Sequence, residues 1–166
     1  MKVLLHLADG FEEIEALSTL DILRRADIDT TTVSIMGRIE VKSSRGVIIQ
    51  ADKIFSDINY QEFDMIILPG GPGTTLLDQH EELKSHLKNY DAEGKWIAAL
   101  CAAPSVLGKL NLLNGKNAVC YPGYENDLLG AKVSLNEKVV VDGNIITSRG
   151  PGTSFDFAFK IVEVLK

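Results

Sequence analysis

The sequence predicts an α/β fold in which helices cover both faces of an open, mostly parallel sheet. Two observations carry this prediction. Short apolar runs bounded by turn residues alternate with stretches of helical period, and no linker-like boundary interrupts the alternation over the 166 residues. A chain of this length can bury roughly 70% of its unfolded surface. We therefore expect one domain spanning residues 1–166.

The first half of the chain begins with an apolar run at residues 3–8, which we expect to form a buried strand that ends at Asp9 and Gly10. A helix is predicted from about Glu12 to Ala26, with acidic residues at its start and basic ones at its end, as its dipole favours. Its apolar side chains recur at helical spacing: Ile14, Leu17, Leu20 and Leu23. β-Branched residues predict a second strand at 30–36, followed by a hairpin formed by 38–42 and 46–50.

The middle of the chain contains two further buried runs, at residues 65–68 and 96–100. A tight Pro- and Gly-rich loop at 69–73 follows the first run. It precedes Thr74, whose hydroxyl we expect to cap the next helix. Another helix is predicted from His80 to Tyr90, and a short one follows the second run and ends near Leu110.

The last third predicts three strands and a closing helix. The strands are expected at residues 118–120, 138–141 and 144–148. Asp142 and Gly143 form a hairpin signal between the last two strands. From Ser154 onward, apolar residues at helical spacing predict the closing helix: Phe155, Ala158, Val162 and Leu165.

Composition excludes several classes of function. Lys and Arg number 17 against 23 Asp and Glu, giving a formal charge of -6, which disfavours nucleic acid or an anionic membrane as a partner. No apolar stretch approaches the ~18 residues of a membrane helix. Only two cysteines occur, and the N-terminal residues do not resemble a secretion signal. A cytoplasmic location is expected.

Cys101 is the strongest candidate for a reactive residue. An apolar run leads into it, small residues follow it, and a helical pattern then begins. This is how a sharp turn from a strand into a helix looks in sequence, and such a turn exposes the side chain. Free N–H groups at the helix start favour the thiolate and are expected to lower the pKa of Cys101. The alternative is that Cys101 is a buried apolar residue, because free cysteines are often buried in protein cores.

Three predicted loops follow parallel strands, at residues 9–15, 69–74 and 101–104, and ligands bind at such strand ends. Glu15 lies in the first turn of its helix and can point inward, although an acidic helix start is often simply solvated. If it reaches Cys101, the two groups cannot both ionise cheaply. The carboxyl would then stay protonated beside a thiolate and act as a general acid.

The glycines of the second loop can likewise have a structural or a functional role. Gly71 can form a tight turn, or its N–H can join that of Ala102 to bind an oxyanion above the sulfur. The loop lacks the residues of the nucleotide-binding signatures.

No metal is expected, because the spacing of the histidines and cysteines suits none. The histidines His6, His80 and His86 are expected to be structural or solvated. Cys120 is expected in the core, with a role as resolving partner for oxidised Cys101 left open.

Four segments together resemble one protein family: LADGFEEIEA, LPGG, AALCAAP and TSRGPGTSF. Their order and separations resemble the ThiJ/PfpI superfamily, and specifically its Parkinsonism-associated deglycase branch. Each motif alone is weak, but the four span nearly the whole chain. The resemblance implies a flavodoxin-like three-layer sandwich, similar to class I glutamine amidotransferases, that forms a homodimer and uses no cofactor.

The resemblance also implies roles for individual residues. Cys101 corresponds to the family nucleophile and Glu15 to its protonated partner. Gly71 and Ala102 correspond to the positions that carry the oxyanion role. Protease-like members place a histidine directly after the nucleophile, where this chain has Ala102. Cysteine peptidase activity is therefore disfavoured.

Three further positions match family residues near the pocket. Arg45 and Arg149 correspond to family arginines on the side of the pocket that faces the dimer. Tyr121, before Pro122, stands where the deglycase branch often has a histidine. A phenol with a pKa of about 10 cannot relay protons at neutral pH as an imidazole does.

The expected function is a cofactor-independent, cysteine-dependent glyoxalase or protein deglycase that acts on methylglyoxal or its early adducts during carbonyl and oxidative stress. The alternative is a redox-sensing, chaperone-like protein whose key event is oxidation of Cys101. The expected partners are a small reactive carbonyl or a glycated amine or thiol, and a second copy of the chain.

Overall fold

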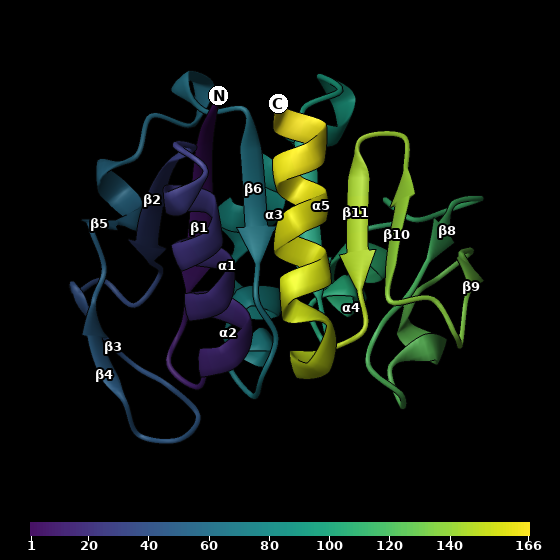
Figure 1. Ribbon diagram of the computed structural model, residues 1–166, viewed down its shortest axis with the longest axis horizontal. Coiled ribbons are helices and arrows are strands. Elements are labelled where there is room, and N and C mark those ends of the chain that lie inside the picture. The colour runs from purple at the N-terminus through teal and green to yellow at the C-terminus, as the bar shows by residue number, and fades with distance from the viewer.

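The computed structural model describes all 166 residues and has the predicted three-layer architecture (Figure 1). Its central sheet has seven strands in the order β10-β11-β7-β6-β1-β2-β5. Every neighbouring pair is parallel except the β10–β11 hairpin. The strands are β1 (Lys2–Leu7), β2 (Asp29–Ser34), β5 (Lys53–Ile54), β6 (Met65–Leu68), β7 (Trp96–Leu100), β10 (Val139–Asp142) and β11 (Ile145–Ser148).

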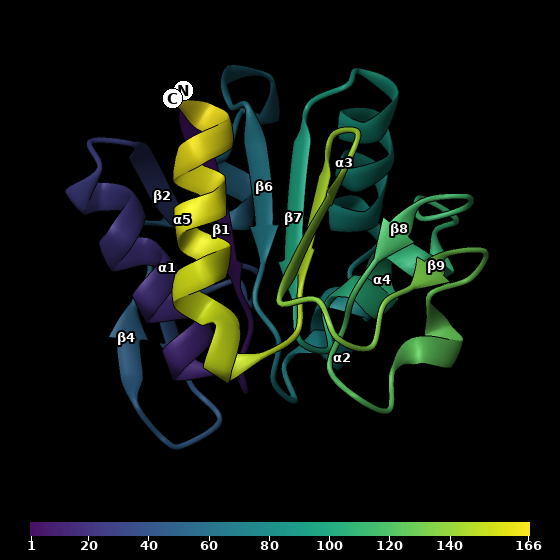
Figure 2. The same ribbon diagram turned by 45° about the vertical axis from the view of Figure 1, so that its right-hand side comes forward.

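Helices form the two outer layers. On one face lie α1 (Glu13–Arg25) and α5 (Ser154–Leu165), in front of the sheet in Figure 1. The opposite face carries α2 (Thr74–Gln79), α3 (Glu81–Ala92) and α4 (Pro104–Lys109), which come into view on the right in Figure 2. Successive residues of a strand point to opposite faces, so the sheet separates two buried apolar clusters of 20 and 17 residues. None of the helices is long and apolar enough to cross a membrane.

Two small ribbons lie outside the main sheet. The predicted hairpin forms β3 (Glu40–Lys42) and β4 (Ile48–Gln50). The strand expected at 118–120 is different: β8 covers only Asn117–Ala118 and pairs with β9 (Lys132–Val133), outside the central sheet. A two-residue strand carries no periodic signal, which is why the sequence did not indicate β9 or its pairing.

The capping role expected for Thr74 is wrong. Gly73 is the N-cap of α2, and Thr74 is the first residue inside the helix. The Thr74 hydroxyl is buried and has no hydrogen-bond partner. His80 instead caps the next helix, because its Nδ1 accepts the N–H of Leu83 at 3.1 Å.

The three histidines, far apart in the sequence, lie around two aromatic rings. His6 is fully buried on β1, and its Nε2 lies 2.7 Å from the hydroxyl of Tyr60. The Tyr60 ring stacks on His86 with 3.7 Å between centroids, and Phe55 packs on His80 at 4.3 Å. No group of side chains in the chain is suited to hold a metal ion. The cluster therefore serves packing, and burial lowers the pKa of His6 to about 3.

Replacing His6 with Asn should make the protein less sensitive to acid. In the unfolded chain His6 has a pKa of about 6.5. Below that pH the unfolded state therefore binds a proton at His6, whereas His6 in the folded state stays neutral. The stability that neutral His6 contributes is present above pH 6.5 and is lost as the pH falls toward 3. Between pH 7.5 and 5 the wild type should lose about 2 kcal/mol relative to His6→Asn.

Denaturant unfolding of both proteins across this pH range measures that difference. Glu15 and the other carboxyls titrate in both proteins, so the comparison isolates His6. Parallel pH profiles would show that His6 is protonated in the folded state as readily as in the unfolded one.

Candidate active site

The sheet order brings together the three loops that the sequence singled out. β1, β6 and β7 are adjacent and parallel, so their carboxyl ends meet at one edge of the sheet. The loops after these strands begin at Ala8, Pro69 and Cys101. Their residues are in direct contact: Glu12 N–H donates to the Gly70 carbonyl at 3.1 Å, and Gly73 N–H donates to the Gly10 carbonyl at 2.9 Å.

Cys101 occupies a sharp corner between β7 and the turn into α4. Its φ of 64° lies in the left-handed region, which a non-glycine residue occupies at a cost of about 1–3 kcal/mol. Hydrogen bonds to two neighbouring segments hold the corner: Cys101 N–H donates to Ser148 at 3.0 Å, and Cys101 C=O accepts from Tyr121 at 2.9 Å. The residue is only 8% exposed. The corner therefore has the strand-to-helix geometry of a nucleophile elbow, although the cysteine is more buried than expected.

Glu15 points inward from the first turn of α1. Its side chain is fully buried, although it follows two other acidic residues, Glu12 and Glu13, at the start of the helix. Oε2 accepts the N–H of Gly70 at 2.8 Å, and the side chain of Cys101 lies beside the carboxyl and acts to lower its pKa. Oε1 receives no N–H or O–H donor from the chain. The structure thus joins Glu15 to Cys101, and the solvated alternative is excluded.

Gly70 is the point on which these two side chains converge. A Cβ atom placed there would lie 2.5 Å from Cβ of Cys101, 3.0 Å from its sulfur and 2.9 Å from Oε2 of Glu15. Sequence reasoning missed this residue, although it is the first glycine of the LPGG segment. Only a residue without a side chain allows the carboxyl and the sulfur to approach the same backbone.

The substitution Gly70→Ala should therefore disrupt the site. We expect overpacking to cost about 1–3 kcal/mol in unfolding free energy and to change the rate at which iodoacetamide alkylates Cys101. Gly152→Ala is the matched control, since a Cβ there has no neighbour within 4 Å. If both variants unfold at the same denaturant concentration, the contacts at Gly70 are not as close as described.

Two backbone N–H groups face the sulfur. The N–H groups of Ala102 and Gly71 favour ionisation of the Cys101 thiol and so act to lower its pKa, and neither donates to a backbone carbonyl. Gly71 has a φ of 91°, and a side chain there would meet the Gly10 carbonyl at 2.7 Å. Its conformation therefore requires glycine. Two N–H donors directed at a nucleophile form the kind of arrangement that stabilises an anion.

Burial raises the pKa of both side chains. For Glu15 the pKa rises from 4.5 to about 7. The pKa of the Cys101 thiol also rises, because burial and the negative charge of Glu15 both oppose its ionisation, while the N–H groups of Ala102 and Gly71 favour it. The lowered cysteine pKa expected from the sequence is therefore wrong. The physical result is a coupled pair that holds one proton between the two groups above about pH 7.

The other predicted pocket residues lie in different places. Tyr121 and Arg149 line one cavity of about 260 Å³ with Pro122 and the turn from Gly150 to Thr153. Arg45 lies in the turn between β3 and β4, where its N–H donates to Glu13 at 2.6 Å. It lines none of the described cavities.

Cys120 is buried, and burial raises the pKa of its thiol to about 11. It packs in the apolar cluster on the α3 side of the sheet, whereas Cys101 belongs to the cluster on the α1 side. No disulfide links them. The packing favours the interpretation of Cys120 as a core residue.

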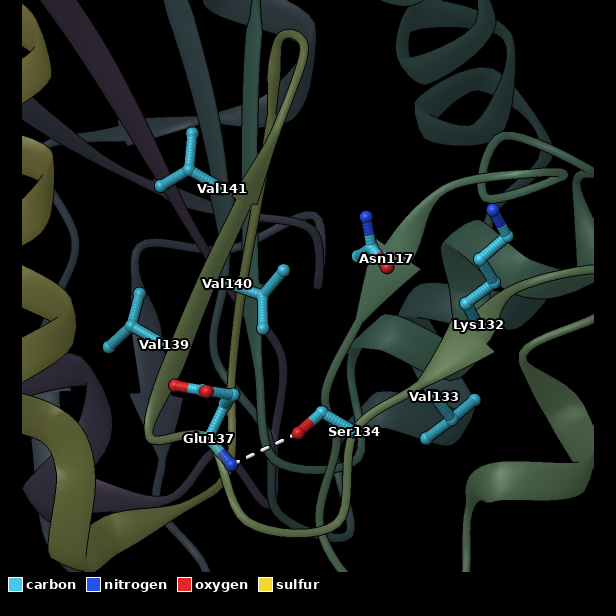
Figure 3. Close-up of a pocket in the computed structure, with 8 residues that line it drawn as sticks. All are labelled: Asn117, Lys132, Val133, Ser134, Glu137, Val139, Val140 and Val141. Carbon is cyan, nitrogen blue, oxygen red and sulfur yellow. Dashed lines mark hydrogen bonds between the residues drawn. The ribbon is translucent and has the colours of Figure 1, made fainter.

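A larger cavity, of about 560 Å³, lies away from Cys101, between the edge strand β10 and the β8–β9 ribbon (Figure 3). Val140 points into it and Asn117 lies opposite. It contains neither cysteine nor any of the predicted site residues. The full lining is Asn117, Lys132, Val133, Ser134, Glu137, Val139, Val140 and Val141.

The fold and this corner define a class of protein: a flavodoxin-like, class I glutamine amidotransferase-like α/β sandwich with a buried cysteine–glutamate pair at the sheet's carboxyl edge. The family model for "DJ-1/PfpI family" matches residues 1–164. The chain belongs to the DJ-1/PfpI family.

Relatives agree with this membership. Protein DJ-1 homolog B of Arabidopsis thaliana is 40% identical over 166 residues, which are 99% of this chain and 38% of the plant protein. The chain thus spans about two fifths of that relative's length. A Pyrococcus abyssi protein named deglycase is 30% identical over 167 residues and covers both chains fully. The structure of oxidized Toxoplasma gondii DJ-1 has a TM-score of 0.93 at 40% identity, covering 99% of this chain and 90% of that one.

Proposed function

We propose that the protein is a cofactor-independent, cysteine-dependent glyoxalase or protein deglycase acting on methylglyoxal or its early adducts. The observation that carries the proposal is the Cys101–Glu15 pair, a sulfur nucleophile beside a carboxyl whose pKa of about 7 suits proton transfer at neutral pH. The name of the Pyrococcus relative supports the same chemistry.

The reactive form is the one in which Glu15 holds the proton. With the proton on sulfur, the carboxylate is stabilised by one backbone N–H, that of Gly70. With the proton on Glu15, the thiolate is stabilised by two, those of Gly71 and Ala102, and by the carboxyl O–H. The raised pKa of the thiol favours the form with the proton on sulfur, and the additional donors on the charged atom keep the thiolate–acid form accessible. Both forms have the same net charge, so the reactive one needs no exchange of protons with solvent.

The reaction needs no external oxidant or reductant. The thiolate adds to the aldehyde carbon of methylglyoxal, and Glu15 protonates the oxyanion to give a hemithioacetal. The ionised carboxylate then removes the proton from that carbon and returns it to the neighbouring one, while the proton of the new hydroxyl passes to the ketone oxygen. These two transfers convert the adduct into a lactate thioester. Water hydrolyses the thioester, releasing lactate and restoring the thiol. The Gly71 and Ala102 N–H groups stabilise the oxyanions.

Lactate production from methylglyoxal by the purified protein, without glutathione, tests the proposal. We expect turnover in proportion to protein concentration and a rate that rises with pH through about 7, where the pair loses its first proton. Production that requires glutathione would contradict the proposal, because the thiol would then come from solution.

Oxidation of Cys101 is the second candidate function. Two N–H groups and a protonated Glu15 would also stabilise a sulfinate, and the similar Toxoplasma structure is that of an oxidized protein. Mild peroxide should then add two oxygens to Cys101 selectively, as mass spectrometry of its peptide would show. Equal oxidation of Cys120 and the methionines, or no dioxygenated Cys101, would remove this candidate.

We propose in addition that the chain forms a homodimer. Three apolar side chains near the start of α1 and on the β3–β4 hairpin are exposed: Ile14 by 54%, Val47 by 46% and Ile48 by 62%. Glu13 holds these two elements together through Ser43 and the N–H of Arg45. Sedimentation should show a dimer that Ile48→Lys dissociates. A monomeric wild type would contradict the proposal.

A further inference from the structure

The central sheet ends at β10 in a row of unpaired backbone groups. β10 is the terminal strand and pairs only with β11, and the Arg149 N–H donates to the Lys138 carbonyl at 3.2 Å. Successive residues of an antiparallel edge strand direct their N–H and C=O groups alternately to the partner strand and away from it. Lys138 faces β11, so Val139 and Val141 direct their backbone groups away from the sheet. No other segment of the chain forms a backbone hydrogen bond with them.

The β8–β9 ribbon leaves this edge open. Figure 3 shows the Val140 side chain pointing toward the ribbon across the cavity, while Val139 and Val141 point the other way. Side chains project from the faces of a sheet and backbone hydrogen bonds lie in its plane, so the ribbon packs over one face of β10. The ribbon is hydrogen-bonded to this strand only at Asp142, which accepts the backbone and side-chain N–H of Asn117 at 2.8 and 3.1 Å.

The open edge is apolar. β10 has three consecutive valines, contains no proline, and exposes 41% of Val141. Exposed edges are usually protected by charged side chains, proline or a bulge, because unpaired N–H and C=O groups beside apolar side chains favour the addition of another strand. The edge of β10 is therefore suited to pair with a further strand.

The sequence of β10 is complementary to itself. In an antiparallel pair centred on Val140, the outward-facing Val139 lies opposite Val141 of the partner subunit, where their free N–H and C=O groups bond to one another. Lys138 then lies opposite Asp142 of the partner subunit, and symmetry repeats this pair of opposite charges, which stabilises the strands. Within its own chain Lys138 has only a long, exposed contact with Asp156, at 3.7 Å.

We infer that two copies of the chain associate through antiparallel pairing of their β10 strands, which joins the two central sheets into one. The inference is independent of the proposed function, because neither Cys101 nor Glu15 takes part. The contact also differs from the proposed homodimer, since the β3–β4 hairpin lies at the opposite end of the sheet (Figure 1). A strand of four residues buries little surface, so we expect a Kd of about 0.1–1 mM, and in dilute solution the hairpin contact dominates.

A single introduced cysteine tests the pairing register. In a chain that also carries Cys101→Ser and Cys120→Ser, Val140→Cys should form a disulfide-linked dimer under mild oxidation. The two copies of residue 140 form a non-hydrogen-bonded pair with Cα atoms about 4.5 Å apart, which a disulfide can bridge.

The matched control for cross-linking is Val141→Cys. Its side chain is more exposed than that of Val140, but in the inferred register it lies opposite Val139 of the partner subunit and not opposite its own copy. We expect Val140→Cys to cross-link at least about tenfold faster. Equal rates, or faster cross-linking of Val141→Cys, would overturn the inference.

Sedimentation separates this contact from the proposed homodimer. In Ile48→Lys, which removes the hairpin contact, self-association should persist at about 1 mM protein. Adding Val141→Lys should weaken it at least about tenfold, because a lysine on an edge strand opposes pairing. Leu129→Lys replaces a residue that is 47% exposed outside β10 and should have no effect. A monomeric Ile48→Lys at this concentration, or equal weakening by both added lysines, would contradict the inference, whereas a wild type without the hairpin dimer would reject only the homodimer.

A charge reversal tests the cross-strand ion pair. In the Ile48→Lys background, Lys138→Asp places like charges opposite one another and should lower the association constant about threefold to tenfold. Lys88→Asp makes the same change in net charge on the exposed side of α3 and should leave association unchanged. Association unaffected by Lys138→Asp, or lowered equally by Lys88→Asp, would rule out the inferred register.

Discussion

Replacing Cys101 with serine should reduce lactate formation from methylglyoxal by at least about 10³-fold, to the background of the uncatalysed reaction. A serine hydroxyl differs from the thiol by one atom, but it does not ionise near neutral pH. Glu15, with its pKa of about 7, is too weak a base to deprotonate it. The measurement is an enzymatic assay of lactate with the purified variant, at protein concentrations high enough to detect a residual rate.

The control for this prediction is Cys120→Ser. Cys120 is buried in the cluster on the other face of the sheet, so its replacement should lower stability but leave turnover per folded molecule close to that of the wild type. Unfolding curves of both variants establish that each is folded. Unchanged turnover in Cys101→Ser would sink the proposed function.

Replacing Glu15 with glutamine should separate sulfur reactivity from catalysis. The amide has nearly the shape of the carboxyl but cannot carry a proton between two carbon atoms, so turnover should fall by about 10²–10⁴-fold. Alkylation of Cys101 should continue, within about tenfold of the wild-type rate. Loss of the Glu15 charge removes one cause that raises the thiol pKa, whereas burial, the largest cause, remains.

The pH profile supplies the second measurement on this variant. In the wild type both alkylation and turnover should rise through pH 7, because the pair loses its first proton there and the thiolate–acid form appears. The variant should lack this rise near pH 7, since glutamine cannot accept the proton of the thiol. If alkylation and turnover fell equally in Glu15→Gln, the carboxyl would act only on the ionisation of sulfur and not in proton transfer.

Much of the fold follows from local sequence signals. The apolar runs that form β1, β6 and β7 and the helical spacing in α1 and α5 are long enough to carry a period. Short elements such as β9 have no period, and their existence depends on pairing with β8. Thr74 shows a similar limit: a threonine after a glycine looks like a cap, but the backbone of Gly73 takes that position and leaves the hydroxyl buried without a partner.

Residues of the candidate site differ in how far sequence could identify them. Cys101 stands out because an abrupt change from a strand pattern to small residues marks a corner, and the resemblance to a family adds Glu15, Gly71 and Ala102. Gly70 could not be recognised, since its importance depends on a close approach between segments 55 and 31 residues away. Arg45 and Arg149 looked equivalent, but only Arg149 lines a cavity beside Cys101.

The sequence by itself determined the fold class and the order of the main elements and indicated a candidate nucleophile, because these depend on hydrophobic period and on local turn chemistry. Only the tertiary structure decided the direction in which the pKa of that residue is shifted. Burial and the contact with Glu15 raise the pKa of the thiol, opposite to the local effect of the helix start. Desolvation and charge coupling depend on which groups the fold brings together, and this information is not present in any one segment of the chain.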